Sequence, residues 1–493
     1  MNFHPERDRR GFHGSLIPQR NENLMMRRRY RPWQVAIVLM STTCALPPYR
    51  SALSDEHATT SVESASKRPN IVLIMVDDMG YGDLPAYGAK DVRTPNLDRF
   101  ASQGVRLTNY YAAGAECTPT RTALLTGLYP QRIGGMECAI GTGNVGRYDD
   151  AIRLRETHDL GLPAEQSVLS SSLKNAGYQT AVFGKWHLGY EPKHHPLKHG
   201  FDQFFGFLGG YVDYYRHREF SDLGVLFEGR KPVETEGYMT KLITDRAVQF
   251  VDASSKDAPF FLYVAFSVPH FPFQPPGNDS GKMVAKEELT KGTRKNYVAM
   301  LKDMDREVGR LLSSLEKRGL TENTLVVFAS DHGAIAPGSN APFRGFKSGL
   351  FEGGIRTACM MRWPGHLPAG VVSDQPAITM DLTTSFIEAG NGKTPDGYRS
   401  DGVDIVQHLS NKKPIPQRTL AWRAKRGDRV WRAIRHDDWK LVTRLEEGKS
   451  EQWLFDLKND SAEQVDQSEK SPQRKAELSK LLTDWEIETK SSR

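Results

Sequence analysis

The sequence predicts an α/β protein with a large doubly wound sheet, followed by a small antiparallel sheet and a helix. Four apolar runs, the first of them rich in β-branched residues, each end in polar residues, at 71–76, 180–183, 260–266 and 324–329. Such runs are typical of buried parallel strands. Helical stretches lie between them, and this alternation of strand and helix is the pattern of a doubly wound sheet.

Polar side chains follow each predicted strand at the point where it ends. They are Asp77 and Asp78, Lys185 and His187, His270, and Asp331 and His332. Ligands of open α/β sheets bind at the carboxyl ends of the strands. We therefore expect these side chains, together with Cys117, to converge on one site.

The remaining elements follow from periodicity. Helices are predicted over 238–253 and over 293–319, where Gly319 gives the second helix a stop. The segments 431–435, 439–443 and 452–457 have the pattern of short antiparallel strands. A terminal helix over 472–488 is expected to pack on them through Leu478, Leu481, Leu482 and Trp485.

A chain of 493 residues exceeds what one hydrophobic core usually holds. We expect an N-terminal extension with a signal peptide over 1–54 and a linker over 55–67. A large catalytic domain is expected over 68–412, and a C-terminal subdomain over 413–493.

The charge of the chain is concentrated in its first part. Residues 1–54 carry nine arginines and three acids, a net +6 that equals the net charge of the whole chain. The neutral remainder argues against nucleic acid as a partner.

Within this part, the basic run 27–31, the apolar stretch 35–46 and the small residues 52–54 have the pattern of an export signal. The stretch is too short for a stable membrane span. A start at Met25 or Met26, or a disordered basic tail on a cytoplasmic protein, are the alternatives.

The chain has four cysteines, too few for a disulfide framework. Cys44 is expected to leave with the signal peptide. Cys138 and Cys359 either pair or stay free. Cys117 is the candidate nucleophile.

Cys117 is expected to lie at the start of a helix. Pro119 fits an early helical position, and Ala123, Leu124 and Leu125 continue the helix. A helix start stabilises anions, so the cysteine there is a candidate low-pKa thiolate, with Arg121 one turn away. The alternative is a buried structural cysteine.

The pairs Asp77-Asp78 and Asp331-His332 are candidate metal ligands. Carboxylate oxygens favour calcium or magnesium. Either pair alone would more simply be a pair of turn residues, but two pairs at predicted strand ends favour a cation site.

A series of ordered motifs resembles the formylglycine-dependent type I sulfatases, an arylsulfatase-like family of the alkaline phosphatase superfamily. The motifs lie at 69–83, 94–98, 115–127, 184–189, 269–272 and 330–354, with a further similarity at 454–460. The resemblance implies an alkaline-phosphatase-like fold. In that fold helices sandwich a large mixed, mostly parallel sheet, and a small C-terminal antiparallel sheet plus helix follows.

The resemblance also implies the role of each site residue. One calcium ion would be held by Asp77, Asp78, Asp331, His332 and Cys117, the last oxidised to formylglycine. The sulfate would be surrounded by Arg121, Lys185, His187, His270 and Lys347. Many family members have Asn in place of His332, and more often Ser in place of Thr120.

The chemistry of the family explains these residue types. Hydrated formylglycine has two hydroxyl groups, and a metal lowers the pKa of the one that attacks sulfur. Arg121, Lys185 and Lys347 offset charge on the sulfuryl oxygens. His270 or Lys347 protonates the leaving oxygen, and His187 takes a proton from the second hydroxyl.

The resemblance thus implies an exported sulfuric ester hydrolase, periplasmic or extracellular, whose substrate is a sulfate monoester. A sulfated carbohydrate is favoured over an aryl sulfate. The implied partners are this substrate and a formylglycine-generating enzyme. Neither a nucleic-acid partner nor a stable membrane span is expected.

Two other functions remain open at this stage. One is a phosphomonoester, phosphodiester or phosphonate hydrolase on the same scaffold. The other is a non-catalytic sulfoglycan-binding protein in which Cys117 stays a thiol. The aromatic and basic segment 211–218 suits glycan binding, or equally a packed surface loop. The glycine pattern over 141–146 lacks the flanking strand and helix of a dinucleotide site and is interpreted as a loop.

Overall fold

A computed structural model describes residues 68–219, 225–255 and 257–491. The predicted signal peptide and linker, and with them Cys44, lie outside the described residues. Within the described part, no helix is both long and apolar enough to cross a membrane.

The main sheet has ten strands in the described part of the chain, in the order β11-β2-β10-β9-β1-β8-β4-β5-β6-β7. Its bounds are β1 Asn70–Asp77, β2 Val105–Leu107, β4 Gln179–Lys185, β5 Gln203–Phe207, β6 Leu226–Glu228, β7 Lys231–Pro232, β8 Phe260–Pro269, β9 Thr324–Ser330, β10 Cys359–Arg362 and β11 Val371–Ser373. The central strands β9, β1, β8, β4 and β5 are parallel, and β10, β6 and β7 are antiparallel to their neighbours. The sheet is therefore mixed but mostly parallel, as predicted.

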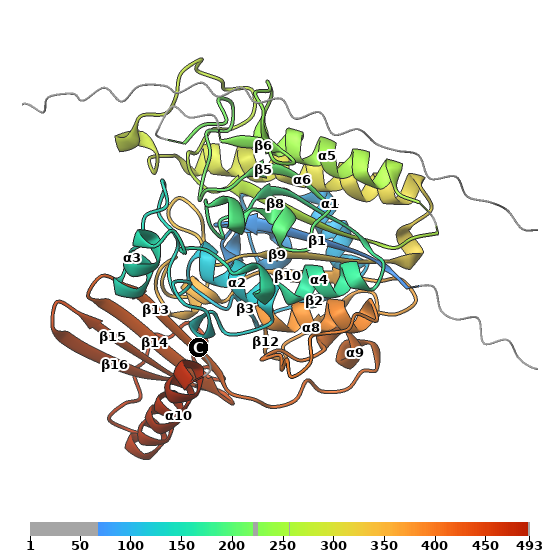
Figure 1. The fold of residues 1–493 in the computed structure, drawn as a ribbon. Helices are drawn as coiled ribbons and strands as arrows, with labels where there is room; N and C mark the ends of the chain where they lie inside the picture. Colours follow the sequence, from blue (N-terminus) through green and yellow to red (C-terminus); the bar gives the residue numbers. More distant parts are fainter. Residues whose placement is uncertain (1–67, 220–224, 256, 492–493) are drawn as a thin grey trace, which may run out of the picture. The chain divides into compact units, whose positions relative to one another are not determined.

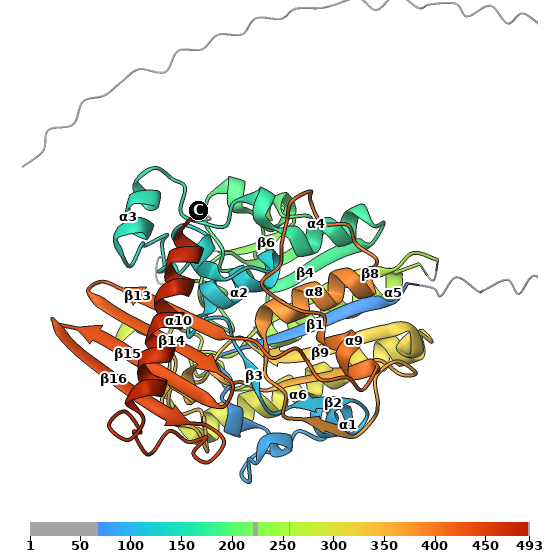
Figure 2. The same cartoon turned by 90° about the horizontal axis from the view of Figure 1, so that it is seen from below.

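Helices cover both faces of this sheet (Figures 1 and 2). One face packs against α1 Pro95–Ser102, α5 Met239–Ala253 and α6 Arg294–Lys317. The other packs against α2 Cys117–Thr126, α4 Val168–Asn175, α8 Thr379–Ala389 and α9 Ile405–Ser410. The central strands are buried throughout because both faces are covered, which explains their continuous apolar runs.

The predicted C-terminal strands form an antiparallel sheet of four strands in the described chain, β13 Leu420–Arg426, β14 Arg429–His436, β15 Trp439–Glu446 and β16 Lys449–Asp456. Helix α10, Pro472–Ser491, lies across β14 and β15 (Figure 2). Leu478, Leu482 and Trp485 are buried there, and Leu481 is partly buried. The apolar face of the sheet also packs on Tyr111, Ala115 and Ala123 near the start of α2.

The short elements complete the chain. The two-stranded pair is β3 Tyr110–Tyr111 with β12 Ala377–Ile378, and the short helices are α3 Asp149–Glu156 and α7 Glu352–Ile355. Helix α7 begins five residues after Lys347. Contacts that fix the position of α7 therefore also restrict the loop that carries Lys347.

A buried ionic cluster joins α7 to the C-terminal sheet. The Nζ of Lys440 lies 2.8 Å from the Oε1 of Glu352 and 3.0 Å from the Oε1 of Glu463, and none of the three side chains is exposed. Burial raises the pKa of Glu352, but Lys440 and Arg356 outweigh burial and lower it from 4.5 to about 2. The ionised carboxylate of Glu352 therefore depends on Lys440.

Gly184 sits where β4 meets β8, one residue before Lys185. Its φ is +116°, and a Cβ atom there would lie 1.9 Å from the carbonyl oxygen of Ala265. Gly88 has a similar φ of +106°, but nothing lies within 4 Å of its Cβ position. Alanine substitutions at the two glycines therefore distinguish the cost of backbone strain from the cost of steric overlap.

We expect Gly184→Ala to lower the free energy of unfolding by more than about 3 kcal/mol, since strain and backbone overlap add. Gly88→Ala should cost about 1 kcal/mol from strain alone. Urea denaturation measures both. Equal losses of unfolding free energy in the two variants would contradict the close approach of Gly184 to the carbonyl group of Ala265 on the neighbouring strand β8.

Lys440→Met should lower the free energy of unfolding by about 3 kcal/mol at pH 7, because it removes the buried cation that lies between Glu352 and Glu463 and leaves Arg356 to pair with Glu352. The stabilisation from ionised Glu352 is present above its ordinary pKa of 4.5 and is lost as pH falls toward 2. The difference in free energy of unfolding between wild type and variant, measured by urea denaturation, should therefore begin to shrink below pH 4.5.

The matched control is Lys425→Met. Lys425 is paired with Asp149, whose side chain is 74% exposed, so the loss should be below about 1 kcal/mol. A Lys440→Met loss as small as this would show that the cluster does not hold the two parts together.

Candidate active site

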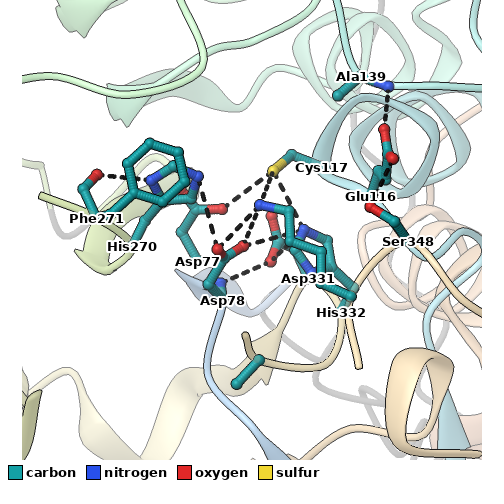
Figure 3. A network of polar contacts seen from close by, with 12 residues as sticks. Asp77, Asp78, Glu116, Cys117, Ala139, His270, Phe271, Asp331, His332 and Ser348 are labelled. Carbon is teal, nitrogen blue, oxygen red and sulfur yellow. Dashed lines mark hydrogen bonds and ion pairs between the residues drawn. The ribbon is translucent and has the colours of Figure 1, made fainter. Parts of the chain in front are cut away.

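The residues predicted at the strand ends lie together (Figure 3). Asp77 ends β1, Lys185 ends β4, and His270 directly follows β8. Asp331 and His332 directly follow β9. Four neighbouring parallel strands thus deliver these side chains to one edge of the sheet, and Cys117 reaches them from the start of α2.

Cys117 is the first residue of α2, as predicted. Glu116 before it is extended, with φ −142° and ψ 164°, and Gly127 in the left-handed region ends the helix. Thr120 donates a hydrogen bond from Oγ1 to the carbonyl oxygen of Gly114 at 3.0 Å, which fixes the turn into the helix. A serine hydroxyl has the same donor, so Thr120 fits the position.

The sulfur of Cys117 lies among both acids and bases. It is 3.3 Å from the Oδ1 of Asp77, 3.1 Å from the Nε2 of His332 and 3.2 Å from the Nζ of Lys185. Burial and Asp77 raise the pKa of the thiol, but Lys185, Lys347 and His332 outweigh them and lower it. The thiol position is therefore favourable for a negatively charged group.

Asp77, Asp78, Cys117 and His332 form a group that could hold a metal ion. Their ligand atoms all lie within 4.8 Å of one another, and all four residues are buried. This donor set fits a divalent cation, because it has two carboxylates and an imidazole. Oxidation of Cys117 to formylglycine would replace its sulfur with oxygen.

The carboxylate of Asp331 lies beside this group. Its Oδ1 accepts the backbone N–H of Asp78 at 3.2 Å, and its Oδ2 accepts Nη2 of Arg121 at 3.2 Å. Burial raises the pKa of Asp331 to about 8 despite nearby His332 and Arg121. Its place in a metal shell stays a prediction.

Three cations face the three carboxylates. Lys185 Nζ is 2.5 Å from Asp77, and Lys347 Nζ is 2.7 Å from the Oδ1 of Asp78. Arg121, 1% exposed, pairs with Asp331 and donates to the carbonyl oxygen of Lys185 at 3.0 Å. Burial raises the pKa of Asp77, but Lys185 and its neighbours outweigh burial and hold the pKa well below its usual range.

His187 and His270 each have one ring nitrogen fixed by a carbonyl group. His187 donates from Nε2 to the carbonyl oxygen of Ile140 at 2.8 Å, and its buried Nδ1 has no partner among the described residues. Burial and Lys185 lower its pKa well below the usual value. His187 is therefore neutral, and its Nδ1 carries no proton.

His270 donates from Nδ1 to the carbonyl oxygen of Phe271 at 2.7 Å, and its Nε2 lies 3.6 Å from the Oδ2 of Asp78. Burial lowers the pKa of His270 to about 3, against the opposite effect of Asp78. The Nε2 of His270 thus faces the carboxylate group from the other side of the site.

The family model for sulfatases matches residues 69–392. The chain belongs to the sulfatase family. Rat N-acetylgalactosamine-6-sulfatase is 36% identical over 361 residues, which are 69% of this chain and 66% of that protein. Mouse arylsulfatase J is 31% identical over 465 residues, 83% of this chain and 74% of that protein.

Among solved structures, Ps i-CgsB superposes on this sulfatase-family chain with a TM-score of 0.74 and 31% identity, covering 85% of this chain and 93% of that one. It has also been solved with k-i-k-neocarrahexaose. This likeness confirms the predicted fold class. The chain spans 66% of the length of rat N-acetylgalactosamine-6-sulfatase, just under two thirds.

Glu116 is a part of the site that sequence reasoning missed. Its buried carboxylate accepts the backbone N–H of Ala139 at 2.8 Å and the hydroxyl of Ser348 at 2.7 Å (Figure 3). It also accepts the thiol of Cys138 at 3.0 Å. It thereby links the start of α2 to the loop of Lys347. Its position directly before Cys117 was the only signal in the sequence.

The segment 211–218 is largely packed. Tyr214 is fully buried and donates from its hydroxyl to the carbonyl oxygens of Ser267 and His270, at 2.8 and 3.0 Å. This tyrosine therefore supports the backbone that carries His270. Cys138 and Cys359 are both free and buried, which resolves the alternatives for them.

We expect a divalent cation to raise the melting temperature of this sulfatase-family protein by several degrees, since binding to the folded state alone stabilises it. Asp78→Asn should remove most of that increase, because it deletes a carboxylate from the group of Asp77, Cys117 and His332. Differential scanning calorimetry with calcium, magnesium and a chelator measures the effect.

Asp83→Asn is the control. Asp83 is equally buried but pairs with Arg294 and Tyr297 instead. This variant should lose stability yet keep the cation-dependent increase. An increase that survives in Asp78→Asn would place the cation elsewhere.

Proposed function

We propose that this protein hydrolyses a sulfate monoester of a sulfated carbohydrate, with Cys117 converted to formylglycine and one calcium ion bound. One observation carries the proposal. The sulfur of Cys117 lies within 3.3 Å of a carboxylate, an imidazole and an ammonium group. The first two suit a metal, and the third suits a sulfate.

Carbohydrate is the proposed substrate class because the names of the relatives point to it. N-acetylgalactosamine-6-sulfatase is named for a sulfated sugar, and Ps i-CgsB was solved in complex with k-i-k-neocarrahexaose. The sugar, the sulfated position and endo or exo action are left open by these names.

The proposed calcium ligands are Asp77, Asp78, Asp331, His332 and residue 117. Carboxylate oxygens are the ligands that calcium prefers. A bound calcium ion would lower the pKa of a hydroxyl at residue 117 and offset charge on the sulfate.

Conversion of Cys117 to formylglycine needs an oxidising maturation enzyme, which we propose as a partner. The hydrated aldehyde would supply one hydroxyl to attack sulfur and a second to expel sulfate. Over the cycle the sulfur–oxygen bond of the ester breaks, the alcohol leaves with a proton, and one water is consumed.

The other site residues act on charge and protons. Arg121, Lys185 and Lys347 are placed to neutralise the sulfuryl oxygens, because their charged groups surround the position of residue 117. His187, neutral with a free Nδ1, suits proton acceptance. Lys347 and His270 are the two candidates for protonating the leaving oxygen, and Lys347 is favoured because pairing with Asp78 keeps it protonated, whereas burial keeps His270 neutral.

We also propose that the chain is exported, from the basic and apolar segments over 27–54. A catalytic domain over 68–412 and a C-terminal subdomain over 413–493 stay our proposed division. The link between them over 413–419 runs from α9 to β13.

The peptide that contains Cys117 should lose roughly 18 Da relative to cysteine after expression with a maturation enzyme, and an aldehyde reagent should trap it. The same material should release sulfate from sulfated saccharides faster than phosphate from the matching phosphate esters. Mass spectrometry and ion chromatography measure the two results.

Cys117→Ala is the control and should bind substrate without turnover. Cys138→Ala should keep both the mass change at residue 117 and the turnover. An unmodified thiol in fully matured, native material would overturn this mechanism, and retained glycan binding would then favour a binding protein.

A further inference from the structure

Phe346 is the one aromatic side chain in the described part of the chain that is largely exposed. It is 56% exposed, whereas every other described phenylalanine, tyrosine and tryptophan is buried or only partly exposed. A single exposed apolar side chain on a protein surface usually needs no explanation. The position of Phe346 is different, because it directly precedes Lys347 of the candidate active site.

The two residues after Phe346 both reach that site. The Nζ of Lys347 lies 3.8 Å from the sulfur of Cys117. The hydroxyl of Ser348 donates to the Oε1 of Glu116, the residue before Cys117, at 2.7 Å. Phe346 is therefore the residue at which this loop passes from the buried site to the surface.

The backbone around Phe346 is held in place. Its carbonyl oxygen accepts the backbone N–H of Gly349 at 3.1 Å. Two residues earlier, the carbonyl oxygen of Arg344 accepts the backbone N–H of Gly353, in α7, at 2.7 Å. The aromatic ring is thus presented to solvent on a fixed backbone, so a ligand that covers it does not have to order the loop first.

The location of Phe346 suits contact with a sugar that is not the sulfated one. Lys347 carries a cation proposed to bind the sulfate that is cleaved, and its side chain is only 13% exposed. The sugar that bears this sulfate must then lie just outside Lys347, and the sugar linked to it must lie further out. Phe346 is one residue along the loop, a step of about 3.8 Å between Cα atoms, and its ring is on the outside.

The faces of a sugar ring and an aromatic ring are complementary. One face of a pyranose carries mostly C–H groups, which are weakly positive, and the face of a phenylalanine ring is negative. Stacking the two also removes apolar surface of both from water. Because the phenylalanine ring has no hydrogen-bonding group, it favours the C–H face of a sugar over a hydroxyl group or a sulfate.

We propose that Phe346 forms a second sugar subsite, in which its ring stacks on the sugar linked to the one whose sulfate is cleaved. The inference rests on the proposed function and narrows its substrate to disaccharides or longer saccharides. Phe346 acts here as a specificity residue and takes no part in the chemical step.

The test compares a sulfated monosaccharide with a disaccharide in which a second sugar is linked to it. The monosaccharide is N-acetylgalactosamine 6-sulfate, or the sulfated sugar on which the mature protein is most active. Release of sulfate gives KM and kcat for both. Phe346→Ala should raise KM for the disaccharide about tenfold, leave its kcat within about twofold, and change both constants for the monosaccharide by less than about threefold.

Phe346→Trp keeps a stacking face and should hold KM for the disaccharide within about threefold of wild type. Ile487→Ala is the matched control, because Ile487 is 62% exposed on α10, which carries none of the site residues. It should leave all four constants unchanged. Since Phe346 is exposed, Phe346→Ala should keep the wild-type melting temperature, so a change in KM is not a loss of folding.

The pattern of KM values decides the outcome. An equal rise for both saccharides in Phe346→Ala would place the ring against the sulfated sugar and overturn the second subsite. Mature wild-type protein that releases no sulfate from any sulfated monosaccharide or disaccharide contradicts the proposed function. Mature protein that releases sulfate, with Phe346→Ala indistinguishable from wild type on the disaccharide, contradicts the second subsite alone.

Discussion

The pairing of three buried acids with three buried cations at the carboxyl edge of the sheet is the constraint on which the geometry of this site depends. Asp77, Asp78 and Asp331 would each be costly to bury alone, and Lys185, Lys347 and Arg121 share that burial. The elements that carry these groups must therefore be held at fixed distances. Close packing of β4 on β8, the carboxylate of Glu116 and the cluster around Lys440 all supply that rigidity.

The central sheet and most of the site were predictable because both follow from short-range patterns. Continuous apolar runs marked β1, β4, β8 and β9, and the residues just beyond them had to meet if the strands were parallel. Pro119 and the apolar residues that follow it separately placed Cys117 at a helix start. Strand order thus brought together side chains about 250 residues apart, such as Asp78 and Asp331. Lys347 was placed at the site only by the resemblance to sulfatases.

The edge strands of the sheets, and the contacts between residues far apart in the sequence, were not predictable from the sequence. The short strands β2, β10 and β11 lack a long apolar run, and β13 was missed because residues 420–426 end in Arg423, Lys425 and Arg426. Lys440 and Glu463 look like surface residues in the sequence, yet both are fully buried. Their burial arises from tertiary pairing, which no local periodicity encodes.

The cluster around Lys440 also bears on the order of events during synthesis. Lys347 and Glu352 leave the ribosome well before β15, so for that interval the carboxylate of Glu352 has no lysine to neutralise it. The loop of Lys347 therefore reaches its final charge balance only after most of the C-terminal sheet has been made. Until then Arg356, four residues further along the chain, is the cation that can pair with Glu352.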